Sequence, residues 1–319
     1  MALASHVWSK FVGFLRRAGG GGWLWLVALA PGCLLAGTAS LGPGSHDLSL
    51  QHQGRERGFI VHVPASYRAD RPVPLVLALH GGGGSMDVMA RDRLYGLVSQ
   101  SDASGWIVVF PNGHSRFRGG KFATWNAGIC CGGARDSGSD DVGFLRAVVA
   151  EVQRRLAIDP QRVFATGMSN GGMMSYRLAC EASDVFRAIA AVAGTDGTTT
   201  CQPGRPVPVF HIHARDDDRV LFNGGSGSAS DTHADFVSVP ATVDKWARLN
   251  TCSGPAKTSL QRPGVVCEVR SGCQGGAEVR LCVTDTGGHS WPGGRKALGG
   301  KGSTALDATA EIWDFFERQ

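Results

Sequence analysis

Short apolar runs of strand length alternate with segments of helical spacing along most of this chain. The apolar runs cover 59–63, 75–79, 106–110, 163–166, 188–192, 207–212 and 279–283. Apolar side chains recur three and four positions apart over 141–156, 171–180, 239–249 and 304–316. Parallel strands are joined by crossover helices and buried on both faces. The alternation therefore predicts an α/β fold with a mostly parallel sheet and helices on both of its faces.

The chain is long enough for one sizeable core, with 319 residues of which 43% are hydrophobic. No linker and no second block of different composition interrupts the alternation, so we expect a single domain over 58–319. Loop insertions are expected around 113–139 and 222–238. The polar, Gly-rich stretch over 40–57 is expected to be an exposed lead-in.

Residues 1–39 have the three parts of an export signal, because a basic stretch precedes an apolar run over 23–35 and small residues follow. A transmembrane anchor is the weaker interpretation, since Pro31 interrupts the run and the run is shorter than the ~20 residues of a span. A lipoprotein signal at Cys33 is also a poor match. We therefore expect a signal peptide over 1–39, and a secreted or periplasmic protein without a stable membrane span.

The cysteine count fits an oxidising compartment. The chain has nine cysteines, and setting aside Cys33 in the signal leaves an even set of eight. An even set in an exported chain predicts structural disulfides, although the spacing does not fix their pairing. A zinc site is the poorer interpretation, because adjacent Cys130-Cys131 does not have the spacing of zinc ligands.

The positive charge of the chain does not predict a nucleic-acid partner. Of the formal net charge of +5, Lys10, Arg16 and Arg17 of the signal supply three charges. No basic stretch is interleaved with aromatic residues, as would be expected of a surface that binds the phosphate backbone of a nucleic acid.

The strongest chemical motif is Gly167-Met168-Ser169-Asn170-Gly171, which follows an apolar strand and opens a helix. This placement is the one that a Gly-x-Ser-x-Gly nucleophile elbow requires. Neighbours without bulk allow the chain to turn sharply, so that the serine hydroxyl projects above the sheet. The motif therefore predicts Ser169 as a nucleophile.

A second glycine-rich segment, His80-Gly81-Gly82-Gly83-Gly84, directly follows the strand at 75–79. A loop in this position can turn a backbone N–H toward a carbonyl oxygen that becomes negatively charged, with the N–H of Asn170 as a second donor. A phosphate-binding loop is the weaker interpretation, because no Gly-Lys-Ser/Thr ending follows.

A serine nucleophile needs a base and an acid that orients it. Among ten histidines, His289 is the best base, because it lies in a Gly-rich loop after the last expected strand. The acid is expected after a strand between the serine and the histidine, where Asp216, Asp217 and Asp218 follow the run at 207–212. The order Ser, Asp, His is that of α/β-hydrolases. A weak calcium site fits these carboxylates poorly.

At this point the sequence resembles a known family, the exported esterases related to polyhydroxybutyrate depolymerases and bacterial feruloyl esterases. The resemblance covers about 55–316. It is carried by LHGGGG (79–84), TWNAG (124–128), CC (130–131), DVGF (141–144), GMSNGGMM (167–174), HIH (211–213) and GHSWPG (288–293). It implies a single-domain α/β-hydrolase fold.

Carried over position by position, the resemblance implies Ser169 as nucleophile, His289 as base, and Gly82 with Asn170 as oxyanion donors. Aligning Val220 and the Asn-Gly-Gly run after it with the family places Asp217 at the acid position. Here Asp216 stands where the family usually has a small residue, and Asp218 stands where it has proline. These two departures put the register of the acid in question.

Trp125 and Trp291 flank the expected site in the sequence. They are proposed as a platform for an aromatic acyl group or a polyester chain, with packing in the core as an equally good interpretation of each.

The sequence therefore predicts a serine carboxylic-ester hydrolase that works through an acyl-enzyme without metal or cofactor. The expected substrates are a hydroxycinnamoyl or acetyl ester of a polysaccharide, or a short-chain polyhydroxyalkanoate. A serine peptidase on the same fold and an exported binding protein without activity are the alternatives.

Overall fold

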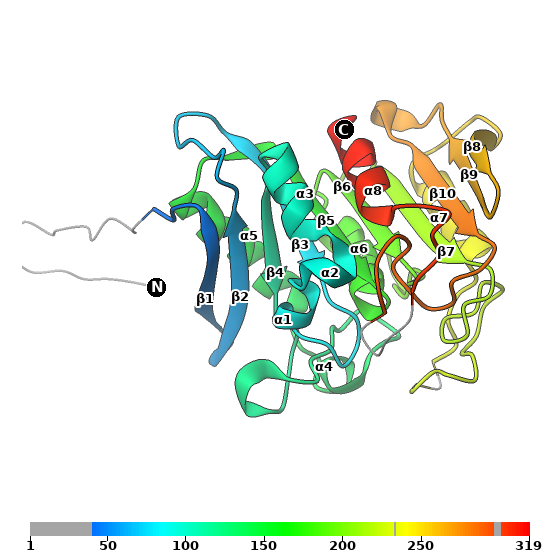
Figure 1. Cartoon of the computed structure of the whole chain (residues 1–319). Helices are drawn as coiled ribbons and strands as arrows, with labels where there is room; N and C mark the ends of the chain where they lie inside the picture. The colour runs from blue at the N-terminus through cyan, green and yellow to red at the C-terminus, as the bar shows by residue number, and fades with distance from the viewer. Residues whose placement is uncertain (1–39, 233, 297–300) are drawn as a thin grey trace, which may run out of the picture. The chain divides into compact units, whose positions relative to one another are not determined.

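The computed structural model describes residues 40–232, 234–296 and 301–319, so the expected signal peptide over 1–39 lies outside the described residues. The strands form one sheet in the order β1-β2-β4-β3-β5-β6-β7-β10-β9-β8 (Figure 1). They are β1 (Gly44–His52), β2 (Arg55–Val63), β3 (Val73–Leu79), β4 (Ile107–Pro111), β5 (Ile158–Met168), β6 (Ala188–Val192), β7 (Val209–Ala214), β8 (Lys257–Arg262), β9 (Val265–Arg270) and β10 (Val279–Thr284).

The central strands from β4 to β10 pair in parallel, and antiparallel strands flank them at both edges. This is the α/β-hydrolase fold that the alternation and the resemblance predicted. The helices are α1 (Met86–Met89), α2 (Asp92–Tyr95), α3 (Leu97–Ser104), α4 (Gly132–Asp136), α5 (Asp141–Arg155), α6 (Asn170–Glu181), α7 (Val239–Leu249) and α8 (Ala308–Glu317), with single 3-10 turns at Arg118–Gly120 and Gln274–Gly276.

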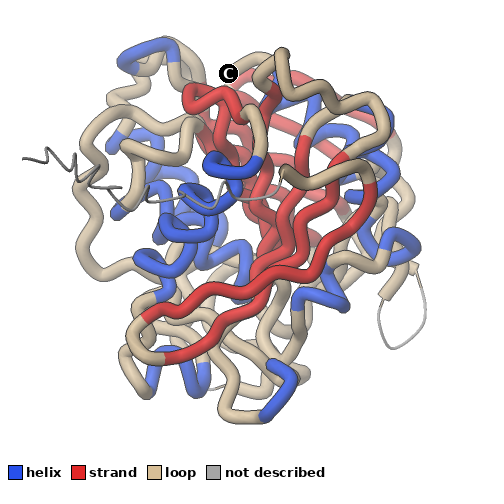
Figure 2. The backbone as a smooth tube through the Cα atoms, turned by 90° about the vertical axis from the view of Figure 1, so that its left-hand side faces the viewer, coloured by secondary structure: helices blue, strands red, loops and turns tan. Residues whose placement is uncertain are grey.

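Helices cover both faces of the sheet, as expected. Helices α3 and α8 pack on one face, and α5, α6 and α7 pack on the other (Figure 1). Viewed from its β1 edge, the sheet is twisted and has helices on either side (Figure 2). Alternate side chains of a central strand therefore enter two cores: Leu75 and Leu77 of β3 pack with α5 and α6, whereas Val76 packs with α3 and α8.

The carboxyl ends of the parallel strands meet at one edge of the sheet. Met168, Val192, Ile212 and Cys282 are aligned across β5, β6, β7 and β10. Consequently the segments that follow β3, β5, β7 and β10, which hold the expected oxyanion loop, nucleophile, acid and base, all leave the sheet on the same side. Ligands of open parallel sheets bind at this edge.

The stretch over 40–57 differs from the expected lead-in, because Gly44–His52 forms β1 and pairs with β2 along its whole length. Its side chains alternate between half-buried and exposed, so Leu48 and Leu50 pack against the core from an edge strand. The hairpin of β8 and β9 and the short helices α1 to α3 were also missed. All are edge strands or short segments with few buried side chains, where the hydrophobic pattern is weakest.

All eight cysteines that the structure describes are paired, as predicted. The disulfides join Cys130 to Cys131, Cys180 to Cys201, Cys252 to Cys273 and Cys267 to Cys282. The last pair links directly opposed residues of β9 and β10. Among the described helices, none combines the length and the apolar character that crossing a bilayer would need.

Candidate active site

Ser169 lies in a strained turn between β5 and α6. Its backbone has φ 56° and ψ −124°, a region that non-glycine residues rarely adopt. The neighbouring strand β6 holds this turn in place, because the N–H of Ser169 donates to Val192 O at 2.8 Å. This is the strand-turn-helix geometry that the Gly-x-Ser-x-Gly pattern predicted.

The two glycines of the motif are required by the close approach of backbones. A methyl group on Gly171 would overlap the carbonyl oxygen of Leu79 at the end of β3. A methyl group on Gly167 would lie 2.5 Å from the carbonyl carbon of Gly171. Any larger residue at either position would therefore push α6 away from the strands and open the turn at Ser169.

The glycine-rich loop after β3 lies directly against this turn. A methyl group on Gly81 would lie 3.5 Å from Ser169 Cβ, and one on Gly82 would lie 3.6 Å from Asn170 Cβ. In the part of the chain that the structure describes, the backbone N–H groups of Gly82 and Asn170 donate to no other group. Two unused amide donors thus flank Ser169, the second of them at the N-terminus of α6.

His80 holds the loop from inside. Its ring is fully buried, with Nε2 accepting from Gly113 N at 2.9 Å and Nδ1 lying 2.8 Å from Gly81 O. Since the amide of Gly113 can only donate, Nδ1 carries the proton and donates to Gly81. Burial lowers the pKa of His80 to about 4, so the ring stays neutral and keeps this tautomer.

Trp125 and Asn170 connect the 113–139 insertion to the same loop. The side-chain oxygen of Asn170 accepts from Trp125 N at 2.7 Å, and its amide nitrogen donates to Trp125 O at 2.9 Å. The indole N–H of Trp125 donates to His80 O at 2.9 Å. These three hydrogen bonds therefore fix the 113–139 insertion against the glycine-rich loop that begins at His80.

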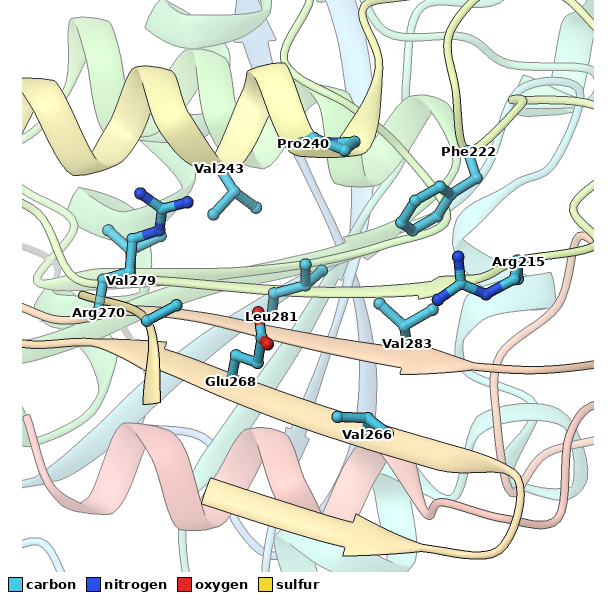
Figure 3. Close-up of a pocket in the computed structure, with 11 residues that line it drawn as sticks. Arg215, Phe222, Pro240, Val243, Val266, Glu268, Arg270, Val279, Leu281 and Val283 are labelled. Carbon is cyan, nitrogen blue, oxygen red and sulfur yellow. The ribbon is translucent and has the colours of Figure 1, made fainter. Parts of the chain in front are cut away.

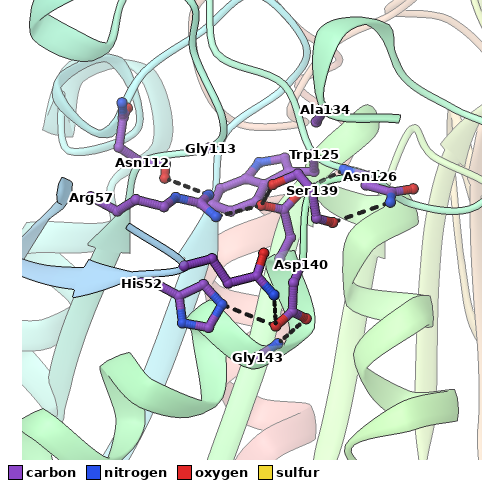
Figure 4. Close-up of polar contacts among 12 residues, drawn as sticks. His52, Arg57, Asn112, Gly113, Trp125, Asn126, Ala134, Ser139, Asp140 and Gly143 are labelled. Atoms are coloured by element: carbon purple, nitrogen blue, oxygen red, sulfur yellow. Dashed lines mark hydrogen bonds and ion pairs between the residues drawn. The ribbon is translucent and has the colours of Figure 1, made fainter. Parts of the chain in front are cut away.

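A buried ion pair anchors this insertion to the sheet (Figure 4). Arg57 of β2 contacts Asp141 at 2.7 Å, and its guanidinium lies 3.8 Å from the ring centroid of Phe144. Asp141 also accepts from the backbone of Asn126 at 2.7 Å, next to Trp125. Asp140 caps α5 by accepting from Gly143 N, whereas Asp141 belongs to this ion pair.

Of the two interpretations given for Trp125 and Trp291, the structure favours packing in the core over a substrate platform. Trp125 has 0% and Trp291 3% of its surface exposed. The indole N–H of Trp291 donates to Thr309 at 2.9 Å, and its ring meets Tyr95 edge to face. Rings buried this deeply offer a substrate almost no surface for stacking. Trp125 instead binds His80 and Asn170, and Trp291 packs in the core.

Among the three consecutive carboxylates, Asp217 is the one bonded to His289. Nδ1 of His289 lies 2.9 Å from Oδ2 and 3.1 Å from Oδ1 of Asp217. Burial alone would raise the pKa of Asp217, but the hydrogen bond from His289, the electrostatic interactions with His289 and His213 and the hydrogen bond from the N–H of Arg219 together lower it. The carboxylate is therefore ionised at neutral pH and holds the imidazole with Nδ1 protonated.

The neighbouring carboxylates have other surroundings. Asp216 accepts from the backbone N–H groups of Gly287 at 3.3 Å and Gly288 at 2.8 Å, which ties down the loop that carries His289. Asp218 is exposed. Asp216 thus holds the loop that carries His289, while Asp217 faces the ring of His289.

Ser169 and His289 are not hydrogen-bonded to each other within the described residues. Nε2 of His289 and the hydroxyl of Ser169 are both left without a partner there. Such bonds are often long before substrate binds and tighten in the complex. The free Nε2 is the atom that a serine base would use.

The sequence of this chain is similar to those of known esterases. The chain is 32% identical to the probable feruloyl esterase C of Aspergillus clavatus over 301 residues, which cover 91% of this chain and 94% of that protein. The chain belongs to the feruloyl esterase family. It is a carboxylic ester hydrolase.

Other relatives agree with this assignment. The putative esterase NocK of Nocardia uniformis subsp. tsuyamanensis is 31% identical, with 82% of this chain and 79% of that protein covered. Feruloyl esterase B of Piromyces equi is 32% identical over 73% of this chain, but the chain spans only 42% of its length. The profile of the prolyl oligopeptidase family matches residues 99–202, which include the elbow.

Solved structures show the same fold at low sequence identity. The acetyl xylan esterase from Aspergillus awamori superposes with a TM-score of 0.59 at 14% identity, covering 86% of this chain and 100% of that one. A thermostable esterase superposes with a TM-score of 0.55 at 17% identity, covering 86% of this chain and 62% of that one.

The structure of this esterase also places an exposed aromatic pair beside the oxyanion loop. Phe122 is 68% and Phe117 61% exposed, with ring centroids 5.6 Å apart. Ala123, next in the chain to Phe122, accepts from Gly83 N at 2.9 Å. Sequence reasoning missed these residues, because it favoured the larger tryptophans and exposure has no local signal.

A cavity of about 310 Å³ lies away from this constellation, between α7 and strands β9 and β10 (Figure 3). Its lining is mostly apolar, with Val243, Leu281 and Val283 among the side chains that point into it. None of Ser169, Asp217 or His289 lines it. Over the described residues, no group of three or more His, Cys, Asp or Glu side chains is arranged to hold a metal ion.

The contacts of the three carboxylates give a direct test of their roles. Asp217→Asn should lower kcat on p-nitrophenyl butyrate by about a thousandfold, because an amide can present its N–H to Nδ1 and favours the wrong tautomer. Asp216→Asn keeps an oxygen acceptor for Gly288 and should cost less than about tenfold. Asp218→Asn is the matched control and should leave kcat unchanged. A loss at Asp216 or Asp218 equal to that at Asp217 would contradict this arrangement.

Proposed function

We propose that this esterase cleaves its substrate with a Ser169-His289-Asp217 triad through an acyl-enzyme. The observation that carries the proposal is the bond between Asp217 and Nδ1 of His289, on the sheet edge where the strained Ser169 projects. The two unused N–H groups of Gly82 and Asn170 beside Ser169 support it.

In the first half-reaction, Oγ of Ser169 attacks the ester carbonyl carbon while Nε2 of His289 takes the hydroxyl proton. The carbonyl oxygen becomes an oxyanion that accepts from the N–H groups of Gly82 and Asn170. The tetrahedral intermediate then expels the alkoxide, which receives the proton from His289 and leaves as an alcohol. The product of this half is an ester between the acyl group and Ser169.

The second half-reaction repeats these steps with water. His289 takes a proton from the water, whose oxygen attacks the acyl carbon, and the same two N–H groups stabilise the oxyanion. The proton then returns to Oγ of Ser169, and the carboxylic acid is released. Asp217 keeps its negative charge throughout and stabilises the imidazolium that forms twice in the cycle.

For the substrate we propose an ester of a hydroxycinnamic acid, such as a feruloyl group on a polysaccharide. The names of the relatives support this choice, and so does the exposed pair of Phe117 and Phe122 beside the oxyanion loop. An aromatic acyl or polymeric group can stack on such a pair. Acetyl esters and short-chain polyhydroxyalkanoates are the competing substrates of the same site.

We also propose that the protein is exported. The four disulfides support an oxidising compartment, because thiols in the cytosol are kept reduced. The basic and apolar character of the first 39 residues supports the same route.

A fluorophosphonate probe tests the nucleophile. The probe should label the wild-type protein and block hydrolysis of p-nitrophenyl butyrate, and Ser169→Ala should show neither labelling nor activity above a few thousandths of wild type. Ser175→Ala, on the same helix, is the matched control and should be labelled normally. Labelling of Ser169→Ala at the wild-type rate would rule out the triad.

A panel of esters with one leaving group tests the substrate. We expect a higher kcat/KM for ethyl ferulate than for ethyl butyrate. Phe122→Ala should raise KM for ethyl ferulate by about five- to tenfold and leave ethyl butyrate unchanged, because only the aromatic acyl group loses its stacking partner. Val266→Ala, another exposed apolar residue, should change neither. Faster hydrolysis of polyhydroxybutyrate film than of ethyl ferulate would favour the polyester, and cleavage of peptide p-nitroanilides alone would favour a peptidase.

A further inference from the structure

A buried line of polar side chains runs from α6 to the carboxylate that faces His289. The hydroxyl of Tyr176 in α6 lies 2.7 Å from Nδ1 of His211, and Nε2 of His211 lies 3.1 Å from Nδ1 of His213, two residues further along β7. Nε2 of His213 then lies 2.8 Å from Val220 O and 3.3 Å from Oδ2 of Asp217. Tyr176 and both histidines have at most 1% of their surface exposed.

One end of this line fixes the direction of every hydrogen bond in it. The carbonyl oxygen of Val220 can only accept, so Nε2 of His213 must carry a hydrogen. A neutral His213 therefore offers a lone pair at Nδ1, which accepts from the Nε2 hydrogen of His211. His211 in turn offers Nδ1 to the hydroxyl of Tyr176. All donors point toward Asp217, and both rings carry their hydrogen on Nε2.

The surroundings keep these groups uncharged. Burial is the main cause that lowers the pKa of His211 well below its ordinary value, with the neighbouring His213 adding to it. Burial also lowers the pKa of His213, against the opposing charge of Asp217. Burial raises the pKa of Tyr176 well above its ordinary value, and the carboxylate of Asp196 acts in the same direction. Tyr176 therefore keeps its hydroxyl proton, and both histidines stay neutral.

We propose that Tyr176, His211 and His213 form a positioning chain that holds the Asp217 carboxylate in its orientation toward His289. This inference rests on the triad of the proposed function, because it concerns the geometry of the acid in that triad. None of the three residues contacts Ser169 or His289 through a hydrogen bond among the described residues. They act through Asp217 and are not catalytic residues.

The turn that presents Asp217 shows how the chain would act. Oδ1 of Asp217 accepts from the backbone N–H groups of Arg219 at 2.9 Å and Val220 at 3.0 Å. His213 donates to the carbonyl of the same Val220 and faces the other carboxylate oxygen. The His213 ring therefore closes the turn from Asp217 to Val220 into one hydrogen-bonded unit, which leaves Oδ2 directed at Nδ1 of His289.

Removing the hydroxyl of Tyr176, which is the end of the positioning chain farthest from Asp217, should weaken the positioning of Asp217 without changing Ser169, His289 or Asp217. In Tyr176→Phe the ring remains, but Nδ1 of His211 loses its donor and is left buried without a hydrogen-bond partner, so His211 is held less firmly against His213. We expect a fall of about fivefold in kcat on p-nitrophenyl butyrate with KM unchanged. Tyr67→Phe is the matched control, because Tyr67 accepts from Ala157 N at 2.7 Å before β5, at the opposite edge of the sheet. It should keep the wild-type kcat.

Substitutions of His213 separate positioning from space filling. His213→Leu fills the site but removes the donor to Val220 and Asp217, and should lower kcat by about a hundredfold. His213→Gln places an amide N–H near the position of Nε2 and should restore kcat to within about fivefold of wild type. Both variants are first checked for wild-type thermal unfolding. If Leu and Gln have the same kcat, the donor at this position has no role.

The ring tautomers provide a readout that does not depend on activity. In protein labelled with 15N-histidine, the ring nitrogen shifts of His211 and His213 should report neutral imidazoles protonated at Nε2, and Tyr176→Phe should change the His211 pattern. Protonation at Nδ1 in either ring, or wild-type kcat in both Tyr176→Phe and His213→Leu, would overturn the positioning chain. If Ser169→Ala remains active, the proposed triad is wrong. If Ser169→Ala is inactive but these variants behave as wild type, only the positioning chain is wrong.

Discussion

The close contact of three backbones, at the ends of β3 and β5 and the start of α6, is the constraint on which the rest of the site depends. Ser169 is held with φ 56° only because Gly167 and Gly171 let α6 approach Leu79 and His80. The same approach brings the loop of Gly81 and Gly82 against Ser169 and Asn170. One steric condition therefore sets both the exposure of the hydroxyl and the place of the amide donors, and strain of this kind persists only where the surroundings over-determine it.

Two buried polar networks lie on either side of that contact, and both hold a loop in place. On the side of the glycine-rich loop, the Arg57–Asp141 ion pair anchors the segment of Trp125 (Figure 4). Trp125 in turn binds Asn170 and His80. On the side of the acid, Tyr176, His211 and His213 lead to Asp217. In both networks, buried groups with fixed donor and acceptor roles hold short loops in a single geometry. Removing any one partner would lower the stability of the fold, because it would leave another buried polar group unpaired.

The sequence predicted the parallel sheet, the elbow and the disulfide character of the chain, because these have strong local or compositional signals. It narrowed the acid to three consecutive residues and needed the resemblance to choose Asp217, since which carboxylate turns inward depends on a turn closed by His213 and Val220. The sequence left open whether Trp125 and Trp291 form a platform or pack in the core, because proximity in sequence says nothing about how deeply a ring is buried. The β1 edge strand and the polar line behind Asp217 were missed for a related reason: both are defined by partners far away in the chain.

The proposed mechanism requires an ester carbonyl between Ser169 and two amide donors, with Nε2 of His289 in reach of both Oγ of Ser169 and the oxygen of the leaving alcohol. The most direct test is a crystal structure of the protein inactivated by an aryl phosphonate. We expect a covalent bond from phosphorus to Oγ of Ser169, a phosphoryl oxygen within hydrogen-bond distance of the N–H groups of Gly82 and Asn170, and Nε2 of His289 facing the phosphonate ester oxygen. Phosphorus on another residue, or a phosphoryl oxygen turned away from both amides, would contradict it.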